Sequence, residues 1–212
     1  REIQRSRGLG DVYKRQVENG VATVTLNRPT ELNTMTPAFW LEMPQVFADL
    51  EDRNDVRVAV IRSTGKHFTA GLDLKTAGVE LSPQKGADAG RVREKLRRKI
   101  RAMQETFSCI ENARFPVIAA VQGGCLGAGV DLVTACCLRF ATKDAFFTIQ
   151  EVNIAIVADV GTLQRVPYLL PQGLIRELAY TGRRMPAAEA LPYGFVNGVF
   201  DDYDACLKRA YE

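Results

Sequence analysis

A glycine-rich segment between two apolar runs constrains the fold of this chain more than any other feature. Residues 116–121 read PVIAAV, residues 123–129 read GGCLGAG, and a further apolar stretch occupies residues 130–137. A short apolar strand, a glycine turn and an apolar helix make a βα unit. Two runs rich in β-branched residues, 21–26 and 56–62, precede this unit and are expected to be strands. The pattern predicts an α/β domain.

The remaining segments extend this alternation along the chain. Apolar residues at helical spacing predict long helices at residues 38–52 and 91–112. Shorter strands are expected at residues 139–142, 146–149 and 197–200, and shorter helices at residues 162–170, 173–180 and 186–191. Residues 75–90 are polar and contain glycine and proline, which predicts an exposed insertion. No repeat or linker divides the chain, so we expect one domain.

The formal charge of +3 is confined to the N-terminal end. The 212 residues include 28 Lys and Arg against 25 Asp and Glu, and residues 1–16 hold five of the basic and two of the acidic residues. Residues 17–212 are therefore neutral, which argues against a nucleic-acid partner because phosphate binding needs a basic surface. The run GLGDVYKRQ resembles the translation of an adapter used to prepare sequencing libraries. We expect residues 1–16 to be a non-native leader and residues 17–212 to be the domain proper.

Composition also excludes several classes of protein and of site. No apolar run approaches the roughly 20 residues of a membrane-spanning helix, so no membrane partner is expected. Five cysteines, an odd number without a CxxC pair, favour reduced thiols and a cytoplasmic location. Because His67 is the single histidine, we expect no metal site and no Ser-His-Asp triad, and we interpret His67 as structural.

Three acidic residues follow the glycine-rich segment and are candidates for acid/base chemistry. Asp131 lies just inside the expected helix, Glu151 follows the strand FFTIQ, and Asp159 lies in an apolar stretch. Backbone N–H groups at a helix N-terminus favour a developing negative charge, although the segment could equally be a tight turn without a ligand. Taken alone, Asp159 fits better as the N-cap of the helix expected from residue 162. Three carboxylates around one glycine loop favour proton transfer.

Several segments together resemble the signature stretches of the enoyl-CoA hydratase/isomerase (crotonase) family. They are residues 25–29 (TLNRP), 67–74 (HFTAGLDL) and 116–123 (PVIAAVQG), and the similarity runs from about residue 17 to the C-terminus. Residues 129–132 (GVDL), 150–152 (QEV) and 158–165 (ADVGTLQR) most closely resemble the Δ3,5-Δ2,4-dienoyl-CoA isomerase branch of that family.

This resemblance implies a crotonase-like spiral of ββα repeats that binds an acyl-CoA thioester. The backbone N–H groups of Leu72 and Ala128 would form an oxyanion hole, with alanine at 128 where the family usually has glycine. Further substrate or CoA contacts are expected at Arg28, Ala70, Gly71, Asp73, Leu74 and Gly127. No separate cofactor is expected, since coenzyme A is part of the substrate. Relatives continue past Glu212 with helices that help assemble a homotrimer or a dimer of trimers, so we expect these C-terminal helices to be truncated.

The acidic residues indicate which reaction of the family to expect. Hydratases have glutamates at positions 131 and 151 and tend to have glycine at 159, whereas here these positions are Asp131, Glu151 and Asp159. We expect one of Glu151 and Asp159 to remove a proton at C2 of a dienoyl-CoA and the other to deliver a proton at C6. Asp131 would orient or electrostatically support them. The favoured assignment is Glu151 at C2, but the sequence leaves the direction open. The alternatives are an enoyl-CoA hydratase, or an inactive module of this fold that binds CoA esters or RNA.

Overall fold

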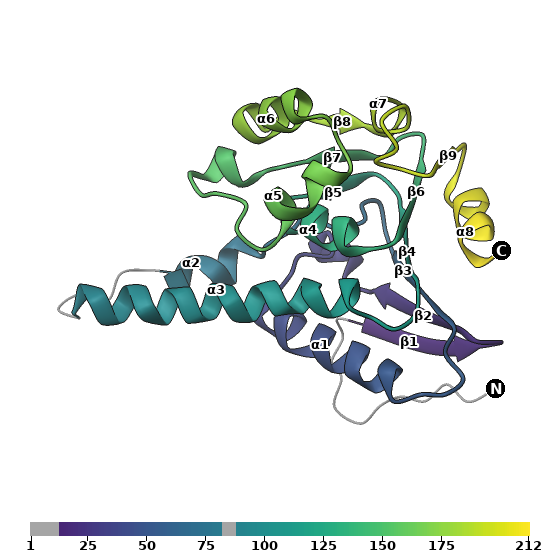
Figure 1. Cartoon of the computed structure of the whole chain (residues 1–212), viewed down its shortest axis with the longest axis horizontal. Coiled ribbons are helices and arrows are strands. Elements are labelled where there is room, and N and C mark those ends of the chain that lie inside the picture. Colours follow the sequence, from purple (N-terminus) through teal and green to yellow (C-terminus); the bar gives the residue numbers. More distant parts are fainter. Residues whose placement is uncertain (1–12, 82–87) are drawn as a thin grey trace.

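The computed structural model describes residues 13–81 and 88–212, which form two β-sheets with helices around them (Figure 1). The first sheet has the strand order β1-β2-β3-β4-β6-β9. Its strands are β1 Tyr13–Glu18, β2 Val21–Leu26, β3 Val58–Ser63, β4 Val117–Val121, β6 Leu138–Thr142 and β9 Gly198–Phe200. Strand β1 is antiparallel to β2, and all other neighbours in this sheet are parallel. The expected α/β class is confirmed.

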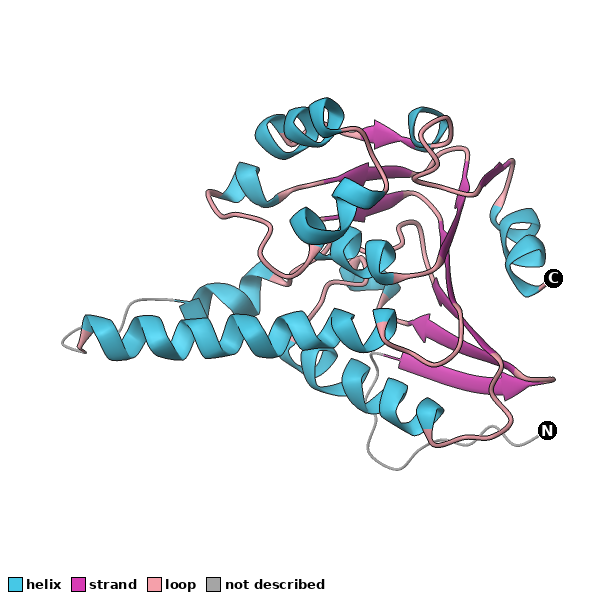
Figure 2. Ribbon diagram, in the orientation of Figure 1, coloured by secondary structure: helices cyan, strands magenta, loops and turns pink. Residues whose placement is uncertain are grey.

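A second, smaller sheet has the order β5-β7-β8 and lies at the top of the molecule in Figure 2. Its strands are β5 Gly124–Leu126, β7 Phe146–Thr148 and β8 Met185–Pro186. The α-helices are α1 Pro37–Glu51, α2 Leu74–Leu81, α3 Ala89–Glu111, α4 Ala128–Ala135, α5 Thr162–Arg165, α6 Gln172–Thr181, α7 Ala187–Ala190 and α8 Tyr203–Tyr211. Three 3₁₀ turns complete the set: η1 Pro29–Glu31, η2 Glu151–Ile154 and η3 Val166–Tyr168.

Successive ββα units wind these elements into a spiral. Strand β4 enters the first sheet, β5 enters the second and α4 follows; β6, β7 and then η2 and α5 repeat the order. In the two earlier turns of the spiral, single bridges replace the second strand, joining Met35 to Leu72 and Thr69 to Cys125. Because each unit ends its second strand at the same side of the molecule, the segments after these strands and bridges come together there.

The central strands β3, β4 and β6 of the first sheet are buried on both faces. Val60, Ala120 and Phe140 pack with Cys206 and Leu207 of α8, which covers the outer face. The inner face belongs to the main core, where α1 and α3 lie side by side (Figure 1) and every residue of α4 is buried. Cover on both faces explains why the segments of these central strands are mostly apolar.

Three segments differ from the sequence predictions. Residues 74–81 form α2 rather than part of an exposed loop, while residues 82–87 of that predicted insertion lie outside the described residues. Helix α8 was not predicted; it is short, and the side chain of Asp202 caps it by accepting a hydrogen bond from Ala205 N–H. The predicted domain boundary at residue 17 falls inside β1, and Tyr13 packs against Phe39 with ring centroids 5.6 Å apart. Residues 1–12 of the predicted leader lie outside the described residues.

None of the helices that the structure describes has both the length and the apolar character needed to cross a membrane.

Candidate active site

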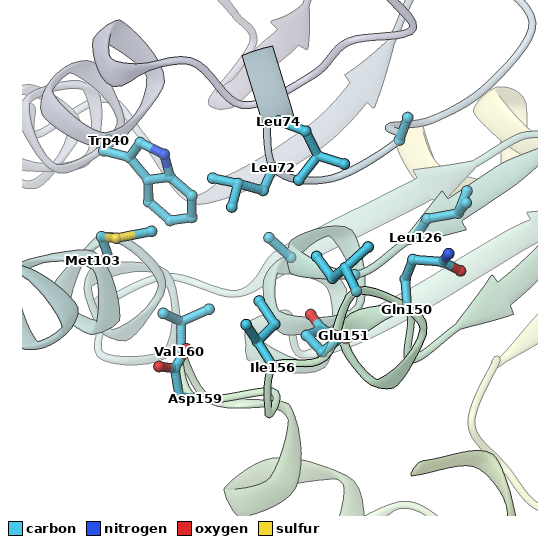
Figure 3. Close-up of a pocket in the computed structure, with 14 residues that line it drawn as sticks. Trp40, Leu72, Leu74, Met103, Leu126, Gln150, Glu151, Ile156, Asp159 and Val160 are labelled. Atoms are coloured by element: carbon cyan, nitrogen blue, oxygen red, sulfur yellow. The ribbon is translucent and has the colours of Figure 1, made fainter. Parts of the chain in front are cut away.

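A largely apolar cavity of about 210 Å³ lies where the ends of the spiral turns meet α1 and α3. Trp40 and Met103 lie on the α1 and α3 side, and Glu151 and Ile156 lie opposite them (Figure 3). The cavity is lined by Trp40, Ala70, Leu72, Leu74, Met103, Leu126, Gly127, Ala128, Gln150, Glu151, Ile154, Ile156, Asp159 and Val160. The polar side chains are few and two are carboxylates, so any charge that develops here does so in an environment poor in water.

A second cavity of about 170 Å³ shares part of this lining. Trp40, Leu72, Met103, Ile156 and Asp159 border both cavities. From these shared residues the second cavity extends along α2 and α3, where its lining adds residues such as Ala77, Leu96 and Ile100. Asp159 therefore lies at the junction of the two cavities.

Two glycine turns approach each other closely at the wall of the first cavity. Gly71 has φ +80°, and a Cβ at this position would lie 2.5 Å from the carbonyl oxygen of Leu126 and 3.3 Å from the backbone N of Ala128. Only glycine fits this approach without displacing backbone atoms. Gly127 has φ +53°, and a Cβ there would lie 3.3 Å from Oε1 of Glu151. The turns that precede Leu72 and Ala128 are therefore adjacent to each other and to Glu151.

The backbone N–H groups of Leu72 and Ala128 carry no hydrogen bond to another of the described residues. Met35 fixes the backbone on both sides of Leu72, since Met35 N–H donates to Gly71 O over 2.8 Å and Met35 O accepts from Asp73 N–H over 3.1 Å. Ala128 is the first residue of α4, where N–H groups have no partner within the helix. Its φ is not positive, so alanine is accommodated at a position where the family usually has glycine.

Glu151 is the buried carboxylate of the cavity wall. It begins η2 shortly after β7, is 9% exposed, and its Oε2 has no hydrogen-bond partner among the described residues. Burial, together with the smaller effect of the charge of Asp131, raises the pKa of Glu151 to about 7. A carboxyl group with this pKa exchanges a proton readily near neutral pH.

Asp159 is partly buried and borders both cavities, and burial raises its pKa. The alternative interpretation as a helix N-cap is wrong. Gly161 is the N-cap of α5, with no side-chain capping bond, and the N–H of Thr162 is bound by Asp131 instead. The side chain of Asp159 is therefore not committed to the helix end.

Asp131 is completely buried on α4 and does not line either cavity. Its Oδ1 accepts a hydrogen bond from Thr162 N–H over 2.5 Å, and its Oδ2 has no partner among the described residues. Burial raises the pKa of Asp131 to about 6. This position fits the supporting role expected from the sequence, since Asp131 influences Glu151 by charge and the loop of Asp159 by a hydrogen bond.

The other predicted contact residues divide into two groups. Ala70, Leu74 and Gly127 line the first cavity, and Gly71 forms the turn beside it. Arg28 and Asp73 lie outside both cavities: Arg28 Nη1 donates to Thr34 O over 3.0 Å and lies 4.0 Å from Asp73 Oδ2. Asp73 also accepts hydrogen bonds from the N–H groups of Lys75 and Thr76 at the start of α2. Contacts of Arg28 and Asp73 with CoA stay predictions.

His67 supports the glycine-rich segment from outside the cavity. Its Nδ1 accepts a hydrogen bond from Gly124 N–H over 2.8 Å, which requires a neutral ring with the proton on Nε2. Burial lowers the pKa of His67, and the charge of Lys66 contributes in the same direction. This bond fits the predicted structural role. Within residues 13–81 and 88–212, no group of three or more His, Cys, Asp and Glu side chains is arranged to hold a metal ion.

The cavity wall opposite Glu151 was not predicted from the sequence. Trp40 and Met103 belong to predicted helices, but helical spacing alone does not distinguish a side chain that lines a cavity from one in the core. Gln104 was also missed. Its side-chain Nε2 donates to the carbonyl oxygen of Asp159 over 2.6 Å, a contact between residues 55 apart that no local pattern indicates.

Residues 16–211 match the enoyl-CoA hydratase/isomerase family, and the chain belongs to that family. A mouse protein named mitochondrial Δ3,5-Δ2,4-dienoyl-CoA isomerase is 47% identical over 192 residues, which are 90% of this chain and 59% of the mouse protein. A peroxisomal protein of the same activity name from Arabidopsis thaliana is 42% identical over 90% of this chain and 69% of its own length. This chain thus spans about 59% of the length of the mouse relative.

Solved structures support the same fold. An enoyl-CoA hydratase from Bacillus anthracis is 30% identical with a TM-score of 0.82, and the match covers 94% of this chain and 74% of that one. An enoyl-CoA hydratase from Shewanella pealeana shares the fold with a TM-score of 0.86 at 22% identity, covering 97% of this chain and 74% of that one. The crotonase-like fold expected from the sequence is confirmed.

Proposed function

We propose that the protein isomerises 3,5-dienoyl-CoA thioesters to 2,4-dienoyl-CoA thioesters, as a step in the oxidation of fatty acids. One observation carries this proposal: two carboxylates with raised pKa values, Glu151 and Asp159, line the same cavity as Leu72 and Ala128, whose N–H groups have no hydrogen-bond partner in the described part of the chain. The relatives named dienoyl-CoA isomerase, 42% and 47% identical to this chain, support the choice of reaction.

In the proposed reaction, the N–H groups of Leu72 and Ala128 donate hydrogen bonds to the thioester carbonyl oxygen. Ionised Glu151 removes a proton from C2, and the electron pair of the C–H bond enters a conjugated enolate. Loss of one such donor raises the barrier by roughly 3–4 kcal/mol in known enzymes, so two donors make a carboxylate base sufficient.

Protonated Asp159 then delivers its proton to C6, which leaves double bonds at C2 and C4. Burial helps keep Asp159 protonated because it penalises the charged form. After release of the product, Glu151 loses its proton and Asp159 regains one from solvent. Asp131 touches neither carbon in this scheme and acts through its charge and its bond to Thr162.

The proposed partners follow from the same site. The acyl-CoA substrate brings coenzyme A with it, so we propose no separate cofactor. Structures of a Thermobifida fusca protein titled putative enoyl-CoA hydratase, in complex with acetoacetyl-CoA and with CoA, support a thioester at this site, at TM-scores of 0.83 and 0.81.

A homotrimer or dimer of trimers is proposed for the full-length protein. A cytoplasmic location stays a prediction, while the names of the mouse and Arabidopsis relatives place those proteins in mitochondria and peroxisomes.

A comparison of two substrates tests the proposed function. Purified protein is mixed with a synthetic 3,5-dienoyl-CoA and, separately, with a 2-enoyl-CoA, and the products are separated and identified. We expect conversion of the first to the 2,4-dienoyl-CoA and little hydration of the second. Preferential formation of a 3-hydroxyacyl-CoA would identify a hydratase instead, and binding of both thioesters without any conversion would identify an inactive binding module.

A further inference from the structure

The residue that we assign to C6, Asp159, lies on the loop that joins η2 to α5. The loop leaves η2 at Ala155, which has φ +59°, and reaches α5 at Gly161. Ile156 and Val157 are 44% and 66% exposed, whereas Ala158 and Val160, the neighbours of Asp159, are buried in the main core. Packing of Ala158 and Val160 fixes the backbone on both sides of Asp159, and hydrogen bonds to two other helices add to this anchorage.

Two side chains from other helices form hydrogen bonds with the backbone of this segment, one at Asp159 and one at Thr162. On α3, Gln104 Nε2 donates to the Asp159 carbonyl oxygen over 2.6 Å. On α4, Asp131 Oδ1 accepts from Thr162 N–H over 2.5 Å. A Cβ at Gly161 would overlap the guanidinium of Arg165, whose Nη2 lies 2.8 Å from Glu111 Oε2 on α3. The segment is thus bound to α3 at Asp159 and to α4 at Thr162.

We propose that Gln104 is a positioning residue for proton transfer: its bond to the Asp159 backbone holds the Asp159 carboxylate at the junction of the two cavities. The inference rests on the proposed function, because it concerns the residue that delivers the C6 proton. Gln104 does not line either cavity, so it acts through Asp159 and not by contact with substrate. Its neighbour Met103 lines both cavities, so the same turn of α3 forms the cavity wall and anchors the loop.

The chemistry of the contact defines the test. A backbone carbonyl only accepts hydrogen bonds, so what position 104 must supply is a donor. Gln104→Met keeps the length of the side chain and removes the donor, whereas Gln104→Lys keeps an N–H donor. Arg101→Met is the matched control, because it introduces methionine at an exposed position on the same helix. The variants are compared with wild type in thermal unfolding and in steady-state turnover of a 3,5-dienoyl-CoA.

We expect Gln104→Met to lower kcat by between about 10-fold and 100-fold with KM nearly unchanged, since misplacing a catalytic group by about 1 Å costs a rate factor of this order. In D₂O, deuterium entry at C6 should fall by the same factor, while exchange at C2, which depends on Glu151, should continue at the wild-type rate. Gln104→Lys should recover most of kcat, and Arg101→Met should match wild type.

Three results would overturn the positioning role in an active enzyme. They are a folded Gln104→Met protein with wild-type kcat, an equal loss of C2 and C6 exchange, or a Gln104→Lys protein as slow as Gln104→Met. If Gln104→Met fails to fold, Gln104→Glu repeats the comparison, because an ionised carboxylate of the same size cannot donate. A wild-type protein that forms no 2,4-dienoyl-CoA would refute the proposed function itself, and the role of Gln104 with it.

Discussion

Three carboxyl groups near one cavity make ionisation costly at each of them. Burial raises the pKa of Glu151 to about 7 and that of Asp131 to about 6, and it also raises the pKa of Asp159. Near neutral pH such groups change protonation state easily, which suits a reaction that removes one proton and delivers another. Because burial penalises the ionised carboxylates, their ionisation lowers the free energy of unfolding. Activity and stability therefore compete at these residues.

Glu151→Gln should therefore stabilise the protein at high pH. The folded state holds the Glu151 proton to about pH 7, whereas the unfolded state releases it near the ordinary value of 4.5. As pH rises from about 4.5 to 7, the unfolded state binds fewer protons than the folded state, so wild type loses stability over this window. We expect Glu151→Gln to exceed wild type by about 1–3 kcal/mol in the free energy of unfolding at pH 8.

The measurement is urea unfolding of both proteins at pH 4.5 and pH 8. The advantage of Glu151→Gln should be small at pH 4.5 and full at pH 8, while isomerase activity is lost at both. An equal difference at the two pH values would mean that the pKa of Glu151 is not raised in the folded protein.

At the scale of elements, the spiral explains how distant segments form one wall. Leu72 follows the third strand of the first sheet, Ala128 follows β5 and Glu151 follows β7, so equivalent positions in successive turns meet. The turn at Gly71 comes within contact distance of Leu126 and Ala128 because Gly71 has a positive φ and no Cβ. The relative placement of the two N–H donors depends on this close approach.

Gly71→Ala should damage both the fold and the site. A methyl group there would lie 2.5 Å from Leu126 O and 3.3 Å from Ala128 N, at a φ of +80° that disfavours alanine. We expect a loss of more than about 1 kcal/mol in the free energy of unfolding, together with loss of isomerase activity. Gly173→Ala in α6 is the matched control, because a Cβ there meets nothing within 4 Å.

Thermal and urea unfolding of the two glycine variants check this prediction. Gly173→Ala should be as stable as wild type or gain up to about 1 kcal/mol, as expected for alanine replacing glycine in a helix. Equal stability of Gly71→Ala and Gly173→Ala would contradict the close approach of the two turns.

Most elements could be predicted because their side chains follow regular patterns. Strand β2 alternates between buried and less buried residues, and α1 buries Phe39, Met43 and Phe47 at helical spacing. Helix α2 was mistaken for loop because the polar, glycine- and proline-containing residues after it dominate the composition of that segment. Helix α8 is only nine residues long, and contact with the outer face of the sheet stabilises it, which no local pattern reveals.

At the scale of the whole molecule, the cavity combines what the sequence indicated with what only the fold provides. Glu151, Asp159, Leu72 and Ala128 were predicted from motifs, and the structure brings all four to one cavity. Trp40 and Met103 form an apolar wall although they are more than 60 positions apart in the sequence, because their helices α1 and α3 are adjacent in the fold. Such long-range packing depends on the complete arrangement of helices and sheets, so motif reasoning could not supply it.

The direction of proton transfer is the central claim and can be measured directly. Wild type and Asp159→Asn are each mixed with a 3,5-dienoyl-CoA in D₂O, and NMR locates deuterium in the thioesters. Wild type should place deuterium at C6 of the 2,4-dienoyl product, whereas Asp159→Asn should exchange the C2 proton and form almost no product. Asp159→Asn that isomerises at the wild-type rate with deuterium at C6 would contradict the assignment of Asp159 as the acid.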